Sequence, residues 1–156
     1  MGMIASFTRL SPAELTQLRQ AATADDKFDY LSDLPRAGEP SGYIDKSWAA
    51  LQFLLLQACS DVDLLYRDDV LDSTDGLYAW SAERVASTAR GLRETSFSTL
   101  AERFDPALMD GTGIYPSGMW STDPDALDYL RHHYTNLVEF FRHAESTGSA
   151  AALRLG

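Results

Sequence analysis

The chain has 156 residues, of which 45% are hydrophobic and 11% aromatic, and it carries a formal net charge of −10 with a pI of about 4.5. This length predicts one domain over residues 1–156 with a core of its own, and the composition is that of a globular protein. The negative charge argues against binding to nucleic acids or anionic membranes, since both need a basic patch. It suits a basic protein partner, although such a charge also serves solubility alone.

The cysteine content and the N-terminus indicate the compartment. The single cysteine, Cys59, excludes an internal disulfide and fits a reducing cytoplasm, which is the location we expect. Cys59 falls at the end of an apolar helical segment, where a free thiol behaves as a small hydrophobic side chain. The N-terminus lacks the features of a signal peptide, and no apolar run approaches the ~20 residues of a membrane span.

The first forty residues predict a strand, a helix and a loop. Ile4 and Phe7, among β-tolerant neighbours, predict a strand near the N-terminus. Ser11, followed by proline and then by Glu14, predicts a helix that begins with a capping box. A short helix is expected around residues 28–34, and the prolines and glycines that follow predict a loop.

The most apolar stretch, residues 43–56, predicts a central buried helix at about 46–58. Asp45 or Ser47 can cap its start by accepting a hydrogen bond from a backbone N–H. Apolar side chains cover most of its circumference, and a helix of this kind is expected to be buried nearly all round.

The acidic segment 61–75 predicts a solvated loop, because its aspartates do not complete an EF-hand pattern. After it we expect a short strand at 77–80, a helix from Ser81 to about Leu92, and a further helix at 96–104. Asp105 and Pro106 restart the chain in a short helical turn, which leads to an aromatic loop. This loop contains Ile114, Tyr115, Pro116 and Trp120.

The longest helix is expected at about 124–146, with Asp123 as its N-cap and Gly148 ending it. Residues 151–155 then predict a final strand. Pairing the N- and C-terminal strands gives a small, mostly antiparallel sheet packed with several helices, which is a single-domain α+β fold.

No motif in the sequence indicates catalysis, a cofactor or a metal ion. The three histidines are His132, His133 and His143, and none forms a His-x-x-x-His pair with another. No nucleophile elbow occurs, and Gly111-x-Gly113 does not lead into a helix as a phosphate-binding loop would. We therefore predict no catalytic residues, no cofactor and no metal ligands.

Seven residues in two places are candidates for binding. Gln52 is a polar residue on an apolar helix, so it marks either a structural network or the wall of a pocket. Exposed aromatic residues next to proline and glycine favour binding, although they can also complete the core. The first place is the entry to the helix, with Tyr43, Asp45, Lys46, Trp48 and Gln52, and the second is the aromatic loop, with Tyr115 and Trp120.

Three segments resemble the bacterial DUF1877 family: residues 1–4 (Met-Gly-Met-Ile), 44–55 (Ile-Asp-Lys-Ser-Trp-Ala-Ala-Leu-Gln-Phe-Leu-Leu) and 114–116 (Ile-Tyr-Pro). The resemblance covers nearly the whole chain. It implies a single-domain α+β fold and a bacterial cytoplasmic protein, but no reaction, because the family is defined by unknown function. Family members typically have histidine where this chain has Gln52, so a proton transfer by that histidine would be absent here.

These observations leave three functional hypotheses. The first is a non-catalytic protein-binding module, such as the immunity partner of a basic toxin. The alternative is a small-molecule pocket, possibly enzymatic, in which Asp45 is the acid or base and Lys46 contacts an anion, with Trp48, Gln52, Tyr115 and Trp120 around them. The third is a housekeeping or stress-accessory role. Neither the oligomeric state nor the ligand follows from the sequence.

Overall fold

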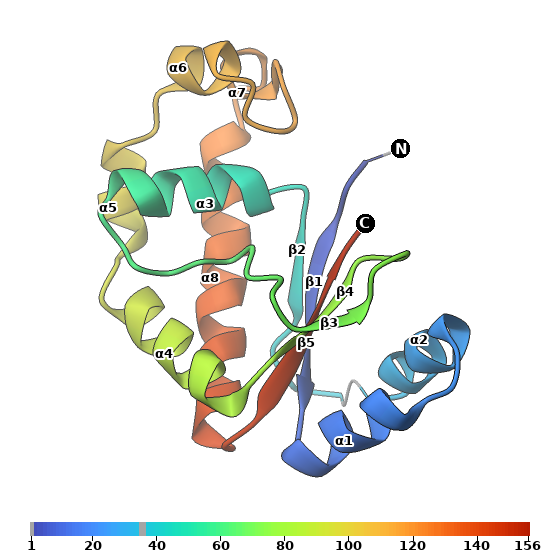
Figure 1. Cartoon of the computed structure of the whole chain (residues 1–156). Helices are drawn as coiled ribbons and strands as arrows, with labels where there is room; N and C mark the ends of the chain where they lie inside the picture. Colours follow the sequence, from blue (N-terminus) through green and yellow to red (C-terminus); the bar gives the residue numbers. More distant parts are fainter. Residues whose placement is uncertain (1, 35–36) are drawn as a thin grey trace.

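Five strands form one antiparallel sheet in the order β2-β1-β5-β4-β3 (Figure 1). The computed structural model describes residues 2–34 and 37–156. Strands β1 and β5 pair along their whole length, which joins the two ends of the chain as predicted. The strands are β1 (Ala5–Leu10), β2 (Gly42–Asp45), β3 (Val70–Asp72), β4 (Leu77–Trp80) and β5 (Ala150–Leu155).

Local capping signals set the start of several helices. Ser11 and Glu14 form the predicted capping box, and Ser81 and Asp105 accept hydrogen bonds from backbone N–H groups as N-caps. No helix within the described ranges is long and apolar enough to cross a membrane. The helices are α1 (Pro12–Gln20), α2 (Ala24–Ser32), α3 (Trp48–Gln57), α4 (Ala82–Arg93), α5 (Phe97–Glu102), α6 (Pro106–Gly111), α7 (Met119–Thr122) and α8 (Ala126–Ser146).

The main core lies between one face of the sheet and the helices α3, α4 and α8 (Figure 1). The long helix α8 corresponds to the predicted helix at 124–146. Within the main core, the rings of Phe7 and Trp80 from the sheet contact the ring of Phe141 from α8. Ring centroids are 5.0 Å apart for Phe7–Trp80 and 5.1 Å for Phe7–Phe141, both in edge-on geometry. Such aromatic pairs combine large apolar burial with favourable quadrupole contacts.

The predicted buried helix at 46–58 is α3, but its start differs from the prediction. Asp45 ends strand β2 in a left-handed conformation with φ of 51°, and Ser47 makes no side-chain capping bond. The Ser47 hydroxyl instead donates to the carbonyl of Ile44 at 2.6 Å. The capping prediction was therefore wrong, because residues 42–45 pair with β1 and the chain must turn before the helix begins.

Three other local predictions are corrected by the structure. Helix α8 begins after Asp125, not after Asp123, whose carboxylate accepts from the Asp125 N–H in the preceding turn. Cys59 lies beyond the end of α3 and is exposed, so it is not part of the apolar face. Trp120 belongs to the short helix α7 and is buried. Residues 35–36 of the predicted loop lie outside the described ranges.

The second face of the sheet is only partly covered, by α1 and α2 (Figure 1). Alternation along β5 decides which residues point to which face. Ala151, Leu153 and Leu155 join the main core, whereas Ala150 and Ala152 join a smaller cluster under the two helices. Arg154 follows in the second series, so the pleat places this cation on the less covered face.

Candidate functional site

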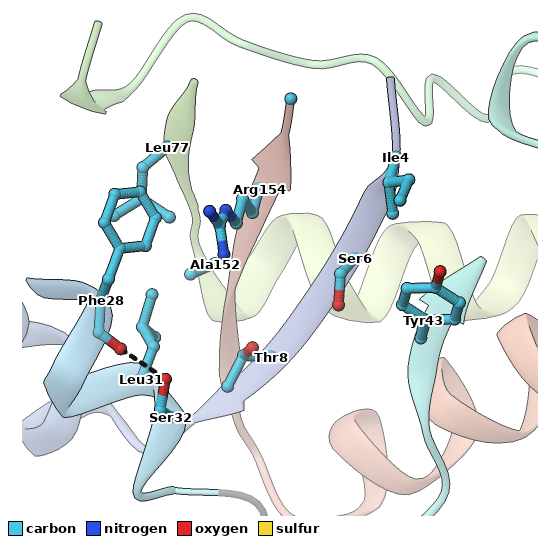
Figure 2. Close-up of a pocket in the computed structure, with 11 residues that line it drawn as sticks. Ile4, Ser6, Thr8, Phe28, Leu31, Ser32, Tyr43, Leu77, Ala152 and Arg154 are labelled. Carbon is cyan, nitrogen blue, oxygen red and sulfur yellow. Dashed lines mark hydrogen bonds between the residues drawn. The ribbon is translucent and has the colours of Figure 1, made fainter. Parts of the chain in front are cut away.

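A groove of about 420 Å³ lies between α2 and the partly covered face of the sheet (Figure 2). We call it the sheet groove. Its volume falls within the range of small-molecule sites, roughly 300–1,000 Å³. A smaller cavity of about 200 Å³ shares Ser6, Thr8 and Tyr43 with it. The residues that line the sheet groove are Ile4, Ser6, Thr8, Phe28, Leu31, Ser32, Tyr43, Leu77, Ala152, Arg154 and Gly156.

The strand register builds the floor of the groove as a row of side chains across the sheet. Ser6 of β1 is opposite Tyr43 of β2 on one side and opposite Arg154 of β5 on the other. Arg154 is in turn opposite Leu77 of β4. Because paired residues on adjacent strands point to the same face, the four side chains lie together in the groove.

The guanidinium group of Arg154 is the charged side-chain group of the groove. Its central carbon lies 4.4 Å from the centre of the Phe28 ring, in a cation–π contact with α2. Figure 2 shows Arg154 between Phe28 on one side and Ser6 on the other. Within the described residues Arg154 forms no ion pair with a carboxylate, whereas Arg9, Arg19 and Arg93 each form one.

Hydroxyl groups and apolar side chains complete the groove. Ser6 and Thr8 are half-buried and carry hydroxyls on the same strand. The Ser32 hydroxyl donates to the carbonyl of Phe28 at 2.8 Å, so it is already engaged within α2. Leu31 and Leu77 are buried apolar walls. An apolar cleft with a few convergent polar groups is the usual composition of a ligand site.

The two predicted binding places come together at the N-terminal segment of the chain. The indole N–H of Trp48 donates to the carbonyl of Met3 at 2.9 Å, and the N–H of Met3 donates to the Tyr115 hydroxyl at 2.8 Å. The Trp48 and Tyr115 rings stack with centroids 5.5 Å apart. Gly2 lies so close to Lys46 that a Cβ on Gly2 would be 2.3 Å from the Lys46 Cε atom. Trp48, Lys46 and Tyr115, which lie in the segments that resemble the family and are called the signature residues below, therefore contact the chain's own backbone at residues 2–3.

Asp45 supports this arrangement from the end of β2. Its carboxylate accepts hydrogen bonds from the hydroxyls of Tyr43 at 3.0 Å and Tyr129 at 2.7 Å. Tyr129 also accepts from the backbone N–H of Lys46 at 3.1 Å. Burial alone would raise the pKa of Asp45, but the hydrogen bonds outweigh it and hold the pKa below its usual value. Burial and the Asp45 carboxylate raise the pKa of Tyr129, which stays a neutral donor.

Gln52 and Trp120 are both engaged with nearby backbone. The Gln52 amide donates to the carbonyl of Val62 at 3.1 Å and accepts from the N–H of Leu64 at 2.7 Å. Gln52 therefore belongs to a structural network, which was one of its two predicted readings. The indole N–H of Trp120 donates to the carbonyl of Ile114 at 3.0 Å.

Replacing Gln52 with methionine is expected to lower the free energy of unfolding by about 1–2 kcal/mol. The similar shape fills the site, but the Val62 carbonyl and the Leu64 N–H lose their partner, and unpaired buried groups cost roughly 1–3 kcal/mol. The lower part of that range applies because the adjacent Asp61 and Asp63 are exposed, so water can reach the loop and partly replace the lost hydrogen bonds. Urea unfolding measures the loss, and unchanged stability would mean that the amide does not hold this loop.

His133 was not predicted as a site residue, yet it is buried next to Asp45 and Tyr129. Its side chain is 8% exposed, and its Nδ1 atom has no hydrogen-bond partner within the described residues. The rings of Tyr129 and His133 are 4.7 Å apart. Burial lowers the pKa of His133 and the neighbouring His132 lowers it further, against an opposing effect of Asp45.

This lowered pKa predicts a loss of stability as the pH falls below about 6.5, the ordinary histidine pKa. The unfolded chain binds a proton at His133 before the folded chain does, so stability falls by up to about 1.4 kcal/mol per pH unit until the folded pKa is reached. Urea unfolding between about pH 6.5 and 5.5 should show a shallower slope for His133→Leu than for the native chain. The exposed neighbour His132 is the control, and His132→Leu with the same effect would contradict the assignment.

A metal site is not found in this region or elsewhere in ranges 2–34 and 37–156, where no three or more His, Cys, Asp or Glu side chains are arranged to hold an ion. Tyr43 was predicted as a binding residue and lies in the sheet groove, whereas Arg154 was not predicted. The alternation in Ala150–Leu155 carries that signal, because arginine is the one charged residue on a strand of alanine and leucine. The strand alone does not reveal that α2 contacts Arg154 through Phe28 but leaves its side chain exposed.

The family profile described as "Domain of unknown function (DUF1877)" matches residues 1–153. The chain belongs to the DUF1877 family. The fold of this DUF1877 domain is similar to the crystal structure of YfbM from Escherichia coli, a protein of unknown function, with a TM-score of 0.72 and 21% sequence identity. The similarity covers 98% of this chain and 99% of YfbM. No curated protein matches the domain.

The family assignment gives a structural meaning to the three segments of resemblance. The described part of the first segment, residues 2–4, meets residues 44–55 and 114–116 where Met3 is hydrogen-bonded to Trp48 and Tyr115. This DUF1877 domain therefore uses its signature to fix the N-terminal segment just before β1. The sheet groove begins one residue later, at Ile4.

Proposed function

We propose that this protein is a binding protein without catalytic activity, and that its ligand is a small molecule held in the sheet groove. The observation that carries the proposal is a groove of about 420 Å³ with apolar walls and an exposed arginine, Arg154, which has no ion-pair partner among the described residues. Arg154 is exposed at the edge of the groove, so its N–H donors are accessible, and charge-assisted hydrogen bonds to an anionic ligand are stronger than neutral ones.

The residues of the family segments support this assignment, because their polar atoms are already hydrogen-bonded within the chain. Trp48 and Tyr115 already direct their polar atoms to Met3, and Gln52 directs both ends of its amide to the loop after α3. A ligand at these residues would have to displace bonds within the chain. In the sheet groove, the side chains of Ser6, Thr8 and Arg154 form no hydrogen bonds within residues 2–34 and 37–156, so a ligand there displaces none of this kind.

Native mass spectrometry of the protein purified from a bacterial host tests the proposal. We expect a small-molecule adduct on the native chain and its loss in Thr8→Trp, which fills the groove from β1. Ser87→Trp on the exposed side of α4 is the matched control and should keep the adduct. An adduct that is absent from the native chain, or equally present in both variants, would contradict the proposal.

A basic protein partner, such as a toxin for which this chain is the immunity protein, is the second candidate. It is favoured by the net charge of −10 and by exposed aspartates in α2 and at its C-cap, namely Asp25, Asp26, Asp29 and Asp33. The measurement is a pull-down at increasing salt with the native chain and with Asp25→Asn/Asp26→Asn/Asp29→Asn. A stoichiometric partner that the native chain loses at high salt and the variant never binds would favour this function; recovery of none would count against it.

A further inference from the structure

We infer that the sheet groove takes an organic monocarboxylate, with the carboxylate on Arg154 and an apolar body between α2 and the sheet. This inference rests on the proposed function and names the ligand class of the same site. Its basis is the row of side chains set by the strand register, in which Arg154 lies between Ser6 and Leu77 and under Phe28.

The contact with Phe28 prepares the guanidinium group for a carboxylate. A cation–π contact uses the face of the planar group, so the N–H groups at its edge stay available as donors. An arginine fork matches the two oxygens of a carboxylate, and such paired, charge-assisted bonds are about twice as strong as neutral ones. Phe28 thus orients the group while leaving its hydrogen-bonding edge open to the groove.

The surroundings of Arg154 favour a single negative charge. The groove offers one guanidinium as its charged side chain, and the other polar side chains that line it carry hydroxyls. A ligand with two charges would keep one of them unpaired in a protein of net charge −10, next to a helix with three exposed aspartates. The hydroxyls of Ser6 and Thr8 can donate to a carboxylate oxygen that Arg154 leaves unfilled.

The remaining lining selects an apolar body. Ile4, Phe28, Leu31 and Leu77 contribute the apolar walls. Leu31 and Leu77 are buried, at 8% and 0% exposure, and they pack in the cluster under α1 and α2. Burial of a hydrocarbon chain against these walls is favourable in proportion to the apolar area removed from water.

The test uses octanoate, 1-octanol and octylamine, which share one hydrocarbon chain and differ in the head group. Titrations are followed through the backbone amide signals of Ser6, Thr8 and Phe28. We expect octanoate to bind about tenfold or more tightly than 1-octanol, and octylamine to bind most weakly, since a hydrogen bond to a charged group contributes about 1.5–3 kcal/mol.

Two variants and a matched control assign the effect to Arg154. Arg154→Met should weaken octanoate about tenfold and leave 1-octanol unchanged, and Arg154→Lys should give an intermediate loss because lysine keeps the charge without the fork. Arg84 is the control, since its guanidinium also lies over an aromatic ring, 3.3 Å from the centre of Tyr66, but outside the groove. Arg84→Met should leave every affinity unchanged.

The outcomes separate this inference from the proposed function. Equal binding of octanoate and 1-octanol, unaffected by Arg154→Met, would overturn the carboxylate assignment while groove binding stands. Preferred binding of octylamine would overturn it as well. If no probe shifts the groove amides, both the carboxylate assignment and small-molecule binding in the groove are overturned.

Discussion

Leu55→Ala is expected to lower the free energy of unfolding by about 2–5 kcal/mol, the range for removing a buried leucine side chain. Leu55 is 0% exposed and belongs to the main core with Leu51 and Leu54 of α3. The loss combines the apolar surface returned to water with the cavity that the neighbouring side chains cannot fill. Urea unfolding of the two proteins measures it.

The neighbouring Leu56 is the matched control for this change. It lies on the same helix and is 61% exposed, so Leu56→Ala is expected to change stability by no more than about 0.5 kcal/mol. A loss below about 1 kcal/mol for Leu55→Ala, or equal losses for the two variants, would contradict the packing assigned to α3.

Trp48→Ala is expected to cost about 2–3 kcal/mol of stability. The change removes the stack on Tyr115 and the hydrogen bond to the Met3 carbonyl. A tryptophan side chain in a fully buried place would cost more, but Trp48 is only partly buried. The measurement is urea unfolding combined with the amide signal of Met3, which should lose its protected environment in the variant.

Tyr115→Phe provides the graded comparison. It keeps the stack on Trp48 and removes only the hydroxyl that accepts from the Met3 N–H, so a loss of about 1 kcal/mol is expected. If instead Trp48→Ala left stability unchanged and abolished ligand binding, Trp48 would belong to the binding site and not to the support of the N-terminal segment.

Much of the fold follows from local sequence signals. Ser11 with Glu14, Ser81 and Asp105 mark helix starts through bonds that form within four residues, so no distant contact is needed to predict them. The long helix α8 and the two terminal strands were likewise predicted from the local sequence. These parts agree with the structure within a few residues.

The start of α3 could not be predicted in this way. Tyr43, Ile44 and Asp45 run directly into the apolar helix, and only their pairing with β1 makes them a strand. The pairing brings together residues almost forty positions apart, which no local pattern reports. The left-handed turn at Asp45 follows from that strand and from the bonds to Tyr43 and Tyr129.

The candidate site likewise has features that the local sequence predicts and features that depend on long-range contacts. The sequence drew attention to Trp48 and Tyr115, and the structure brings them together, but their polar partner is Met3 of the chain itself. Arg154 lies in the groove because three strands pair in one register and α2 covers the sheet only in part. Both conditions are long-range, so the sequence of β5 marks Arg154 as a lone charge but cannot place it in a groove.

The most direct test of this account is the amide NMR spectrum of the protein with the protein-free, small-molecule fraction of a bacterial extract. We expect the shifted signals to map to Ser6, Thr8, Phe28 and Arg154 in the sheet groove. Signals that shift instead at Asp45, Trp48, Gln52 and Tyr115, with the groove unchanged, would contradict it and return the binding site to the signature residues.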